Sequence, residues 1–341
     1  MRKKSIFAVL FVAILVVLLA LAGCGQNQPQ AQQPEKLKPN SLEIGTAAAG
    51  GVYVFYGNGV ASLASQALGI PVTGIETDGP NHNLILIQDG DIMLGLTTMG
   101  PAFEAWNGIG EWTGGQKFDN VRSLFPMFNT YFHWVADADS GIANLRDMDG
   151  KRVGSGPKAG TIGVFGPRFF ELLGIEPANI SWGALSGLLD NQGDGLLDAT
   201  GFAAGIPVSG FREYESRRGG NVVYIGVDGA DRDKLLAEWE FLSAAVIPKG
   251  TYDALTNDLQ TVGMFNIAIA HKDLHDDYVY EIVKAVMENN EFMVTAHSSA
   301  KGTVLENFKF MDIIPLHPGA IRYFRERNID IPSHLIPPEY K

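Results

Sequence analysis

The chain has 341 residues, a formal net charge of −12 and one cysteine, Cys24. The excess of acidic residues argues against nucleic-acid binding, which usually needs a basic face. A single cysteine excludes an internal disulfide and a cluster of metal-bound thiolates. The length is enough for a large core or two lobes, and the stability of the fold has to come from packing.

The N-terminal residues have the order of an export signal. Basic residues at positions 2–4 precede an apolar run over positions 6–21, and small residues stand directly before Cys24. This order is typical of a secretory signal peptide. The alternative is a membrane-spanning helix, for which the run is marginal, because a span needs about 20 apolar residues. The string Leu21-Ala22-Gly23-Cys24 resembles a bacterial lipobox. That resemblance implies a signal peptide over residues 1–23 and a lipid on Cys24 that anchors the exported protein to the outer face of the cytoplasmic membrane.

The segment after the signal is polar. Residues 25–40 contain three prolines and no apolar stripe, so they cannot bury a core. We expect residues 24–40 to form a disordered tether that lets the body move over the membrane surface. Without residues 1–23, the chain keeps 23 Lys and Arg against 38 Asp and Glu, a net charge of −15.

Beyond residue 40, short apolar runs alternate with segments of helical length. We expect strands over residues 42–45, 71–76 and 92–96, with a glycine-rich loop and a helix over 52–68 after the first and a short helix over 84–88 before the third. A second block contains a strand that ends at residue 153, a helix over 161–173, strands over 180–182, 199–203 and 222–225, an apolar run over 262–270 and an amphipathic helix over 276–289. This alternation indicates an α/β protein with largely parallel sheets.

The same order of strand, glycine-rich loop and helix occurs in both blocks, which predicts two lobes. We expect residues 41–134 with 265–341 to form the first lobe and residues 135–264 the second. Ligands of open α/β sheets bind at the carboxyl ends of strands, often against helix N-termini. The loops over residues 46–53 and 154–161 are therefore candidate halves of a binding site, whose free N–H groups can hold a carboxylate.

Several segments between residues 42 and 325 resemble the TAXI family of solute receptors for TRAP transporters. The matching segments are Ile44-Gly45-Thr46, Gly50-Gly51-Val52-Tyr53, Asp78 to Leu84, Gly90-Asp91-Ile92, Asp139 to Val153 and, as the most specific, Leu316-His317-Pro318-Gly319-Ala320-Ile321-Arg322-Tyr323. The resemblance implies the type II periplasmic-binding-protein fold, with a ligand cleft between two lobes. It also implies a receptor without catalytic activity, which delivers a small solute to a membrane permease driven by an ion gradient.

The candidate ligand-binding residues come from loops and strand ends that this fold would bring together. Amides on the loop after the second strand can donate and accept hydrogen bonds. Thr161 can add a hydroxyl donor or serve as an N-cap. The candidates are Thr46, Gly50, Gly51, Val52, Tyr53, Asn81, Asn83, Thr97, Thr98, Gly160, Thr161, Phe202, Gly205 and Pro207.

The second glycine-rich loop departs from the resembled family at one position. Some members place an arginine directly after the Gly-Thr pair, where this chain has Ile162, and Lys158 is the basic residue that can replace it. The expected ligand is a small organic acid or an amino acid, glutamate-like or another carboxylate. The missing arginine favours a monocarboxylate, or a ligand less anionic than glutamate.

Other motifs are incomplete, so we expect no cofactor and no metal, and the acidic charge predicts no nucleic-acid partner. The first loop lacks the Lys and Ser/Thr of a P-loop, and the second is one residue off the dinucleotide fingerprint. His271 and His275 have metal-ligand spacing, but the acidic residues beside them favour a solvated helix start. Two alternatives stay open on the same scaffold: a ligand-binding sensory lipoprotein, or an exported enzyme.

Overall fold

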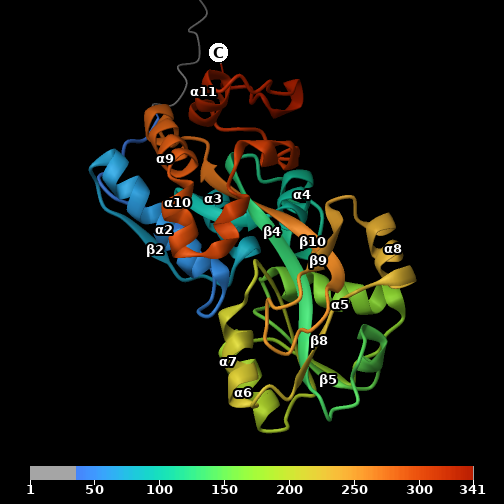
Figure 1. Cartoon of the computed structure of the whole chain (residues 1–341). Helices are drawn as coiled ribbons and strands as arrows, with labels where there is room; N and C mark the ends of the chain where they lie inside the picture. Colours follow the sequence, from blue (N-terminus) through green and yellow to red (C-terminus); the bar gives the residue numbers. More distant parts are fainter. Residues whose placement is uncertain (1–35, 341) are drawn as a thin grey trace, which may run out of the picture. The chain divides into compact units, whose positions relative to one another are not determined.

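The computed structural model describes residues 36–340 (Figure 1). The predicted signal peptide, the lipid site at Cys24 and most of the predicted tether lie outside the described residues. The last residues of that tether are described. Leu37 forms a parallel bridge with Leu274, and its N–H donates to the carbonyl oxygen of Asp273 at 2.7 Å. Among residues 36–340, no helix is both long and apolar enough to cross a membrane.

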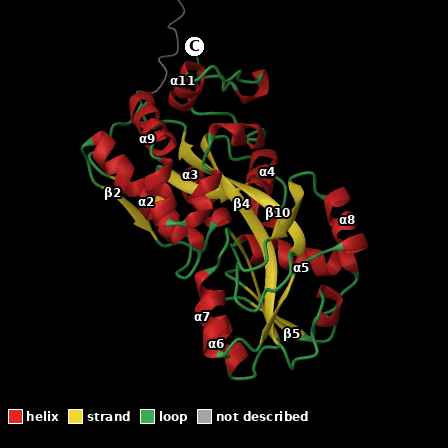
Figure 2. Ribbon diagram, in the orientation of Figure 1, coloured by secondary structure: helices red, strands yellow, loops and turns green. Residues whose placement is uncertain are grey.

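The described residues form one mixed sheet of ten strands in the order β2-β1-β3-β10-β4-β7-β5-β6, with β8 beside β4 and β9 beside β10. Strands β2 and β3 run parallel to β1, and β6 and β7 run parallel to β5. Between these two groups, the long strands β4 and β10 pair antiparallel with each other and with their neighbours (Figure 2). The strands are β1 (Leu42–Gly45), β2 (Val72–Ile75), β3 (Leu94–Thr98), β4 (Val121–Asp137), β5 (Arg152–Ser155), β6 (Asn179–Ser181), β7 (Ala199–Ala204), β8 (Val222–Ile225), β9 (Leu242–Ile247) and β10 (Leu259–His271).

Helices cover each parallel group (Figure 1). Helix α2 packs on β2 and α9, whereas α5 and α6 pack on β7. The helices are α2 (Val52–Leu68), α3 (Pro80–Asp89), α4 (Met99–Asn107), α5 (Thr161–Leu173), α6 (Leu185–Gly193), α7 (Ser209–Arg217), α8 (Gly229–Glu238), α9 (Asp276–Glu288), α10 (Asn290–Ala296) and α11 (Pro318–Glu326).

The predicted α/β class is confirmed, and the predicted strand over 42–45 and helices over 52–68 and 161–173 have the observed bounds. One local prediction was wrong. Asn81 and Asn83 do not lie on a loop, because α3 starts at Pro80 and includes both of them. Proline is well placed at the first helical position, where its missing N–H would have no partner within the helix.

The two long strands form the centre of the hydrophobic core. Phe125, Phe132 and Trp134 of β4 are fully buried, and β10 is buried from Thr261 to its end. Phe132 contacts Phe169 of α5 with ring centroids 4.9 Å apart. Burial on both faces explains why these strands have no alternation of polar and apolar residues.

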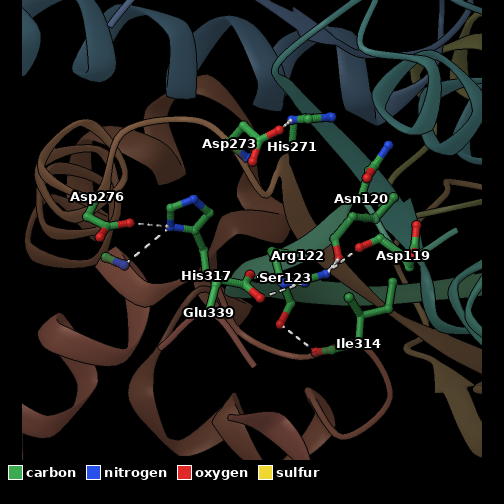
Figure 3. Close-up of polar contacts among 12 residues, drawn as sticks. Asp119, Asn120, Arg122, Ser123, His271, Asp273, Asp276, Ile314, His317 and Glu339 are labelled. Carbon is green, nitrogen blue, oxygen red and sulfur yellow. Dashed lines mark hydrogen bonds and ion pairs between the residues drawn. The ribbon is translucent and has the colours of Figure 1, made fainter. Parts of the chain in front are cut away.

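The string from Leu316 to Tyr323, which carries the resemblance most specifically, has a structural role. His317 is fully buried, and its Nδ1 accepts a hydrogen bond from the Gly319 N–H at 3.2 Å, which caps α11. Figure 3 shows its ring directed toward Asp276, at the start of α9. A Cβ at Gly319 would collide with the carbonyl oxygen of Asp276, so the close packing of α11 on α9 requires glycine there.

The two ends of the described chain are held in the same region. Arg122 on β4 donates to both carboxylate oxygens of Glu339 at 2.6 and 3.0 Å, and the pair is largely buried (Figure 3). Lys36 forms an ion pair with Asp276. Lys36, the first described residue, therefore lies beside the start of α9.

His133 on β4 belongs to a fully satisfied hydrogen-bond chain. Its Nε2 lies 2.8 Å from the Tyr252 hydroxyl and its Nδ1 lies 3.1 Å from the carbonyl oxygen of Tyr131. The Tyr252 oxygen accepts from the Val208 N–H at 3.0 Å. The chain is complete when Nδ1 carries the proton and Tyr252 donates to Nε2. Burial lowers the pKa of His133 to about 4, because the charged ring cannot be hydrated there.

His133 should make the free energy of unfolding depend on pH. The unfolded imidazole has a pKa of about 6.5, so between pH 6.5 and pH 4 the unfolded state binds the extra proton. We expect the contribution of His133 to be complete above pH 6.5 and to decrease by roughly 3 kcal/mol as the pH falls toward 4. Urea unfolding at about pH 7.5 and pH 5 measures the decrease. A His133→Gln variant should lose less stability between these two pH values, and an equal loss would show that His133 is not the group responsible.

Candidate functional site

Three helices begin behind parallel strands with their N-termini at one cavity. Gly51 precedes α2, Gly79 precedes α3 and Gly160 precedes α5, and no side chain caps any of these helices. All three glycines line the cavity. The N–H groups of a first helical turn carry the positive end of the helix dipole. The cavity therefore offers a positive potential to an anionic group. Its hydrogen-bond donors come from α2 and α5, because Pro80 at the start of α3 has no N–H and the Asn81 N–H already donates to the Ala159 carbonyl oxygen.

The cavity, which we call the cleft, lies between loops from both predicted lobes. It has about 40 Å³ of free space, which is room for a few water molecules, since one needs roughly 10–15 Å³. An organic ligand therefore needs the loops to part. The lining residues are Ala47, Ala48, Gly51, Val52, Tyr53, Asp78, Gly79, Pro80, Thr130, Pro157, Gly160, Thr161, Ile162, Phe202, Ala203 and Ala204.

Hydrogen bonds join the two sides of the cleft. The hydroxyl oxygens of Thr98 and Thr161 are 3.1 Å apart. At the surface, the Ser209 hydroxyl donates to the carbonyl oxygen of Gly50 at 3.1 Å. Each such bond adds only about 0.5–1.5 kcal/mol, because water replaces it when it breaks. These two hydrogen bonds therefore oppose separation of the two sides only weakly.

A buried polar network forms the floor of the cleft. The Tyr53 hydroxyl donates to Oδ1 of Asn266 at 2.5 Å, and Nδ2 of Asn266 donates to the Phe128 carbonyl oxygen at 2.6 Å and to the Thr130 hydroxyl at 2.9 Å. Burial raises the pKa of Tyr53 well above its ordinary value, so the hydroxyl keeps its proton and remains a donor. Asn266 thus fixes Tyr53 and Thr130, which both line the cleft.

Asn81 has an unusual position in the first turn of α3. Its side chain is buried, and neither Oδ1 nor Nδ2 has a hydrogen-bond partner among the described residues. Its backbone N–H donates to the carbonyl oxygen of Ala159 across the cleft at 3.3 Å. A buried amide without partners costs roughly 1–3 kcal/mol. Such a cost is typical of a site that serves a purpose other than stability.

Asn83, two residues further on, has the opposite environment. Its Nδ2 donates to the carbonyl oxygens of Gly45 and Thr46 at 3.1 and 2.8 Å and to that of Leu96 at 2.8 Å. Its Oδ1 accepts from the Thr77 hydroxyl at 2.8 Å. Asn83 therefore joins the carboxyl ends of β1 and β3 to α3, and its role is structural.

Six of the fourteen ligand-binding residues predicted from the sequence line the cleft: Gly51, Val52, Tyr53, Gly160, Thr161 and Phe202. The candidates that do not line it are Thr46, Gly50, Asn81, Asn83, Thr97, Thr98, Gly205 and Pro207. Gly205 packs against Ser299, where a Cβ would collide with the Ser299 hydroxyl. Sequence reasoning missed Thr130 and Asn266. The sequence signal that could have identified them is that each is a polar residue within a long, mostly apolar segment.

The charges at the cleft are few. Asp78 is the acidic residue that lines it, and its side chain is exposed. Lys158 is also exposed, and its Nζ lies 5.8 Å from the centre of the Trp182 ring, outside the lining. Within the described residues, no cationic side chain lines the cleft. Positive potential there comes from the helix N-termini.

Comparison with known proteins gives a family match and a fold. A family model described as "NMT1-like family" matches residues 44–327. The structure of the periplasmic binding protein BugD has a TM-score of 0.54 and 12% identity, over 86% of this chain and 99% of that chain. An ancestral arginine-binding protein bound to arginine has a TM-score of 0.49 and 15% identity, over 77% of this chain and 99% of that chain. The arginine-, lysine-, histidine-binding protein ArtJ from Geobacillus stearothermophilus has a TM-score of 0.48 and 13% identity, over 80% of this chain and 100% of that chain.

At these identities the likeness to BugD shows a shared fold. The described residues therefore have the α/β fold of two-lobed periplasmic binding proteins, as the sequence predicted. The predicted boundaries near residues 134 and 265 fall inside β4 and β10, the strands that connect the two parallel groups, and they stay a prediction.

Replacing Asn266 by leucine should destabilise the whole floor of the cleft. Asn266→Leu leaves the Tyr53 hydroxyl and the Thr130 hydroxyl without their common partner in a buried position. We expect a loss of about 2–4 kcal/mol in the free energy of unfolding. The control Thr130→Val removes one hydroxyl of the same network and should cost about 1 kcal/mol. Urea unfolding of both variants measures the difference, and an equal or smaller loss in Asn266→Leu would contradict a shared network.

Proposed function

The chain belongs to the NMT1-like family, and from that membership and the cleft we propose that it is an extracytoplasmic receptor for a small carboxylate solute. The observation that carries this proposal is the cleft itself. Loops from both predicted lobes meet there with three uncapped helix N-termini, beside a buried amide that has no partner among the described residues. The shared fold of periplasmic binding proteins supports it.

The charges of the cleft narrow the class of ligand. Helix N-termini suit one carboxylate, and Asp78 at the lining suits a positively charged group. A second carboxylate would lie in a cleft without a cationic side chain. We therefore favour an amino acid or another monocarboxylate over a dicarboxylate. Tyr53 and Phe202 provide an apolar wall on each side. Asn81 is buried next to the lining residue Pro80, and its amide can donate to and accept from a ligand once the loops part.

Capture would work through closure of the cleft. Contacts such as the Thr98–Thr161 and Ser209–Gly50 hydrogen bonds exist only when the two sides meet. A ligand that binds both sides at once favours that state by its difference in affinity for the closed and the open cleft. The ligand then leaves unchanged. Asp78 is the one carboxylate among the described lining residues, so the lining provides no carboxylate pair for catalysis.

Replacing Asn81 by leucine should change ligand affinity and stability in opposite directions. In Asn81→Leu, we expect the ligand-free protein to be as stable as the wild type or more stable, because two unpartnered buried atoms are removed. Ligand affinity should fall by roughly tenfold or more. Thermal-shift screening with amino acids, aromatic acids and dicarboxylates identifies the ligand, and calorimetry gives the affinities.

Asn83→Leu is the matched control for that experiment. It removes hydrogen bonds that join β1 and β3 to α3, so it should destabilise the ligand-free protein by several kcal/mol. Unchanged affinity in Asn81→Leu would remove Asn81 from the binding site. Tight binding of glutamate in preference to monocarboxylates would contradict the class of ligand inferred from the charges.

We further propose that the receptor is anchored through a lipid on Cys24 and delivers its ligand to a TRAP-type permease. The lipobox-like string and the resemblance to the TAXI family support this. In cells that produce the full chain, ligand uptake should collapse when an ionophore removes the ion gradient, and it should survive depletion of ATP. A Cys24→Ser variant should lose both a radioactive lipid label and sedimentation with membranes. Uptake that depends on ATP alone would contradict the permease type, and retained label would contradict the lipid site.

A further inference from the structure

A second and larger hollow lies on the other face of β4. Thr130 lines the cleft, whereas its neighbours Asn129 and Tyr131 line a groove of about 820 Å³. Over residues 129–131 this separation agrees with the alternation of successive side chains along a strand, whereas Phe128, which lies at the register shift of β4, also lines the groove. The groove, which we call the hinge groove, is bounded by β4, β9, β10 and the short helices η3 (Ser298–Gly302) and η4 (Leu305–Phe310).

The hinge groove has the size of a small-molecule site, and its lining mixes aromatic rings with many polar side chains. Pockets for organic ligands measure about 300–1,000 Å³ and combine apolar walls with a few polar groups. Phe265 and Phe310 stack with ring centroids 4.6 Å apart in its wall, and Phe310 remains 38% exposed. Two cations and two anions also line the groove, so their charges cancel: Lys301, Lys309, Glu240 and Asp312. This lining suits a molecule with an apolar body and no net charge.

The cleft and the hinge groove share walls. Phe128 lines the groove, and the edge of its ring contacts Tyr53 of the cleft with centroids 6.3 Å apart. The loop after β7 serves both cavities: Ala204 lines the cleft, and Ile206 lines the groove. Ser209, three residues further on, makes the hydrogen bond across the mouth of the cleft. The two cavities therefore share residues through which a change in the width of one can reach the other.

The position of the groove fixes the direction of this coupling. The groove combines residues of the first predicted lobe, such as Phe310, with residues of the second, such as Phe241 and Ala244. The same two lobes meet at the cleft on the opposite face of β4. With the groove and the cleft on either side of residues 129–131, a bend of the connecting strands that parts the lobes at the cleft would narrow the groove.

We propose that the hinge groove is a second binding site, for an uncharged or zwitterionic amphipathic organic molecule, and that its occupant favours the closed cleft. A molecule in the hinge groove holds the lobes apart there and so opposes opening of the cleft. This coupling rests on the closure described under the proposed function, whereas binding in the groove does not depend on it.

Dansylamide, an uncharged fluorescent naphthalene sulfonamide, tests the binding site. Its fluorescence should rise saturably on addition of the purified full chain. Ala244 of β9 lines the groove, and Ala244→Phe should fill part of it and weaken binding by roughly tenfold. Val246 lies on the same strand outside the lining, so Val246→Phe is the matched control and should bind as the wild type does. Equal binding by both variants, or no saturable binding, would overturn the proposal.

A chain whose cleft can be locked tests the coupling. Thr98→Cys with Thr161→Cys, in a Cys24→Ser background, places two thiols where the hydroxyl oxygens are 3.1 Å apart. After mild oxidation, with disulfide formation verified by thiol titration, dansylamide should bind several-fold more tightly than to the reduced protein. Equal affinities would overturn the coupling. The thermal-shift screen can fail to find a solute while the oxidised variant still binds dansylamide more tightly than the reduced one. That result would reject the proposed solute receptor and support the hinge groove, so the failure of one proposal is distinguishable from the failure of the other.

Discussion

The pairing of β4 with β10 is the constraint on which the rest of the structure depends. These strands join the parallel group β1–β3 to the parallel group β5–β7, and their register determines where the loops of the two groups meet. The register shifts between Phe265 and Ile267, which leaves Asn266 without a pairing residue on β4. Irregularities of this kind redirect a side chain. Here Asn266 forms hydrogen bonds with Tyr53 and Thr130. The irregularity in the sheet therefore positions the side chain that links the two polar residues at the floor of the cleft.

Local signals allowed the parallel parts of the fold to be predicted. The signals for these parts, a strand followed by a glycine-rich loop and a helix with a 3.6-residue period, lie within a short stretch of sequence. Both ends of helix α5 were therefore predicted at the observed residues. Strand β4 was missed as an element, because burial on both faces leaves an apolar run without period. For the same reason Thr130 and Asn266 could not be assigned to the cleft. Their position depends on the pairing of strands that are more than 120 residues apart in the chain.

The two asparagines of α3 show what a sequence pattern cannot separate. Asn81 and Asn83 are two residues apart and were both predicted to bind ligand. The helix turns Asn83 toward the ends of β1 and β3, where four partners satisfy it, and leaves Asn81 buried with no partner among the described residues. One residue lowers the free energy of the fold and the other raises it. Proteins accept such local conflicts mainly at functional sites, and this contrast identifies Asn81 as the stronger candidate for recognition.

The alternation of side chains along a strand also limits how a hinge can be built. A strand that presents Thr130 to a ligand must present Asn129 and Tyr131 to the opposite face. If the lobes move about that strand, the opposite face cannot be packed solid, since its two sides have to approach and separate. Some apolar surface there therefore stays accessible, as Phe310 does. Under the closure proposed above, a molecule that fills the hinge groove therefore acts on the equilibrium between open and closed clefts.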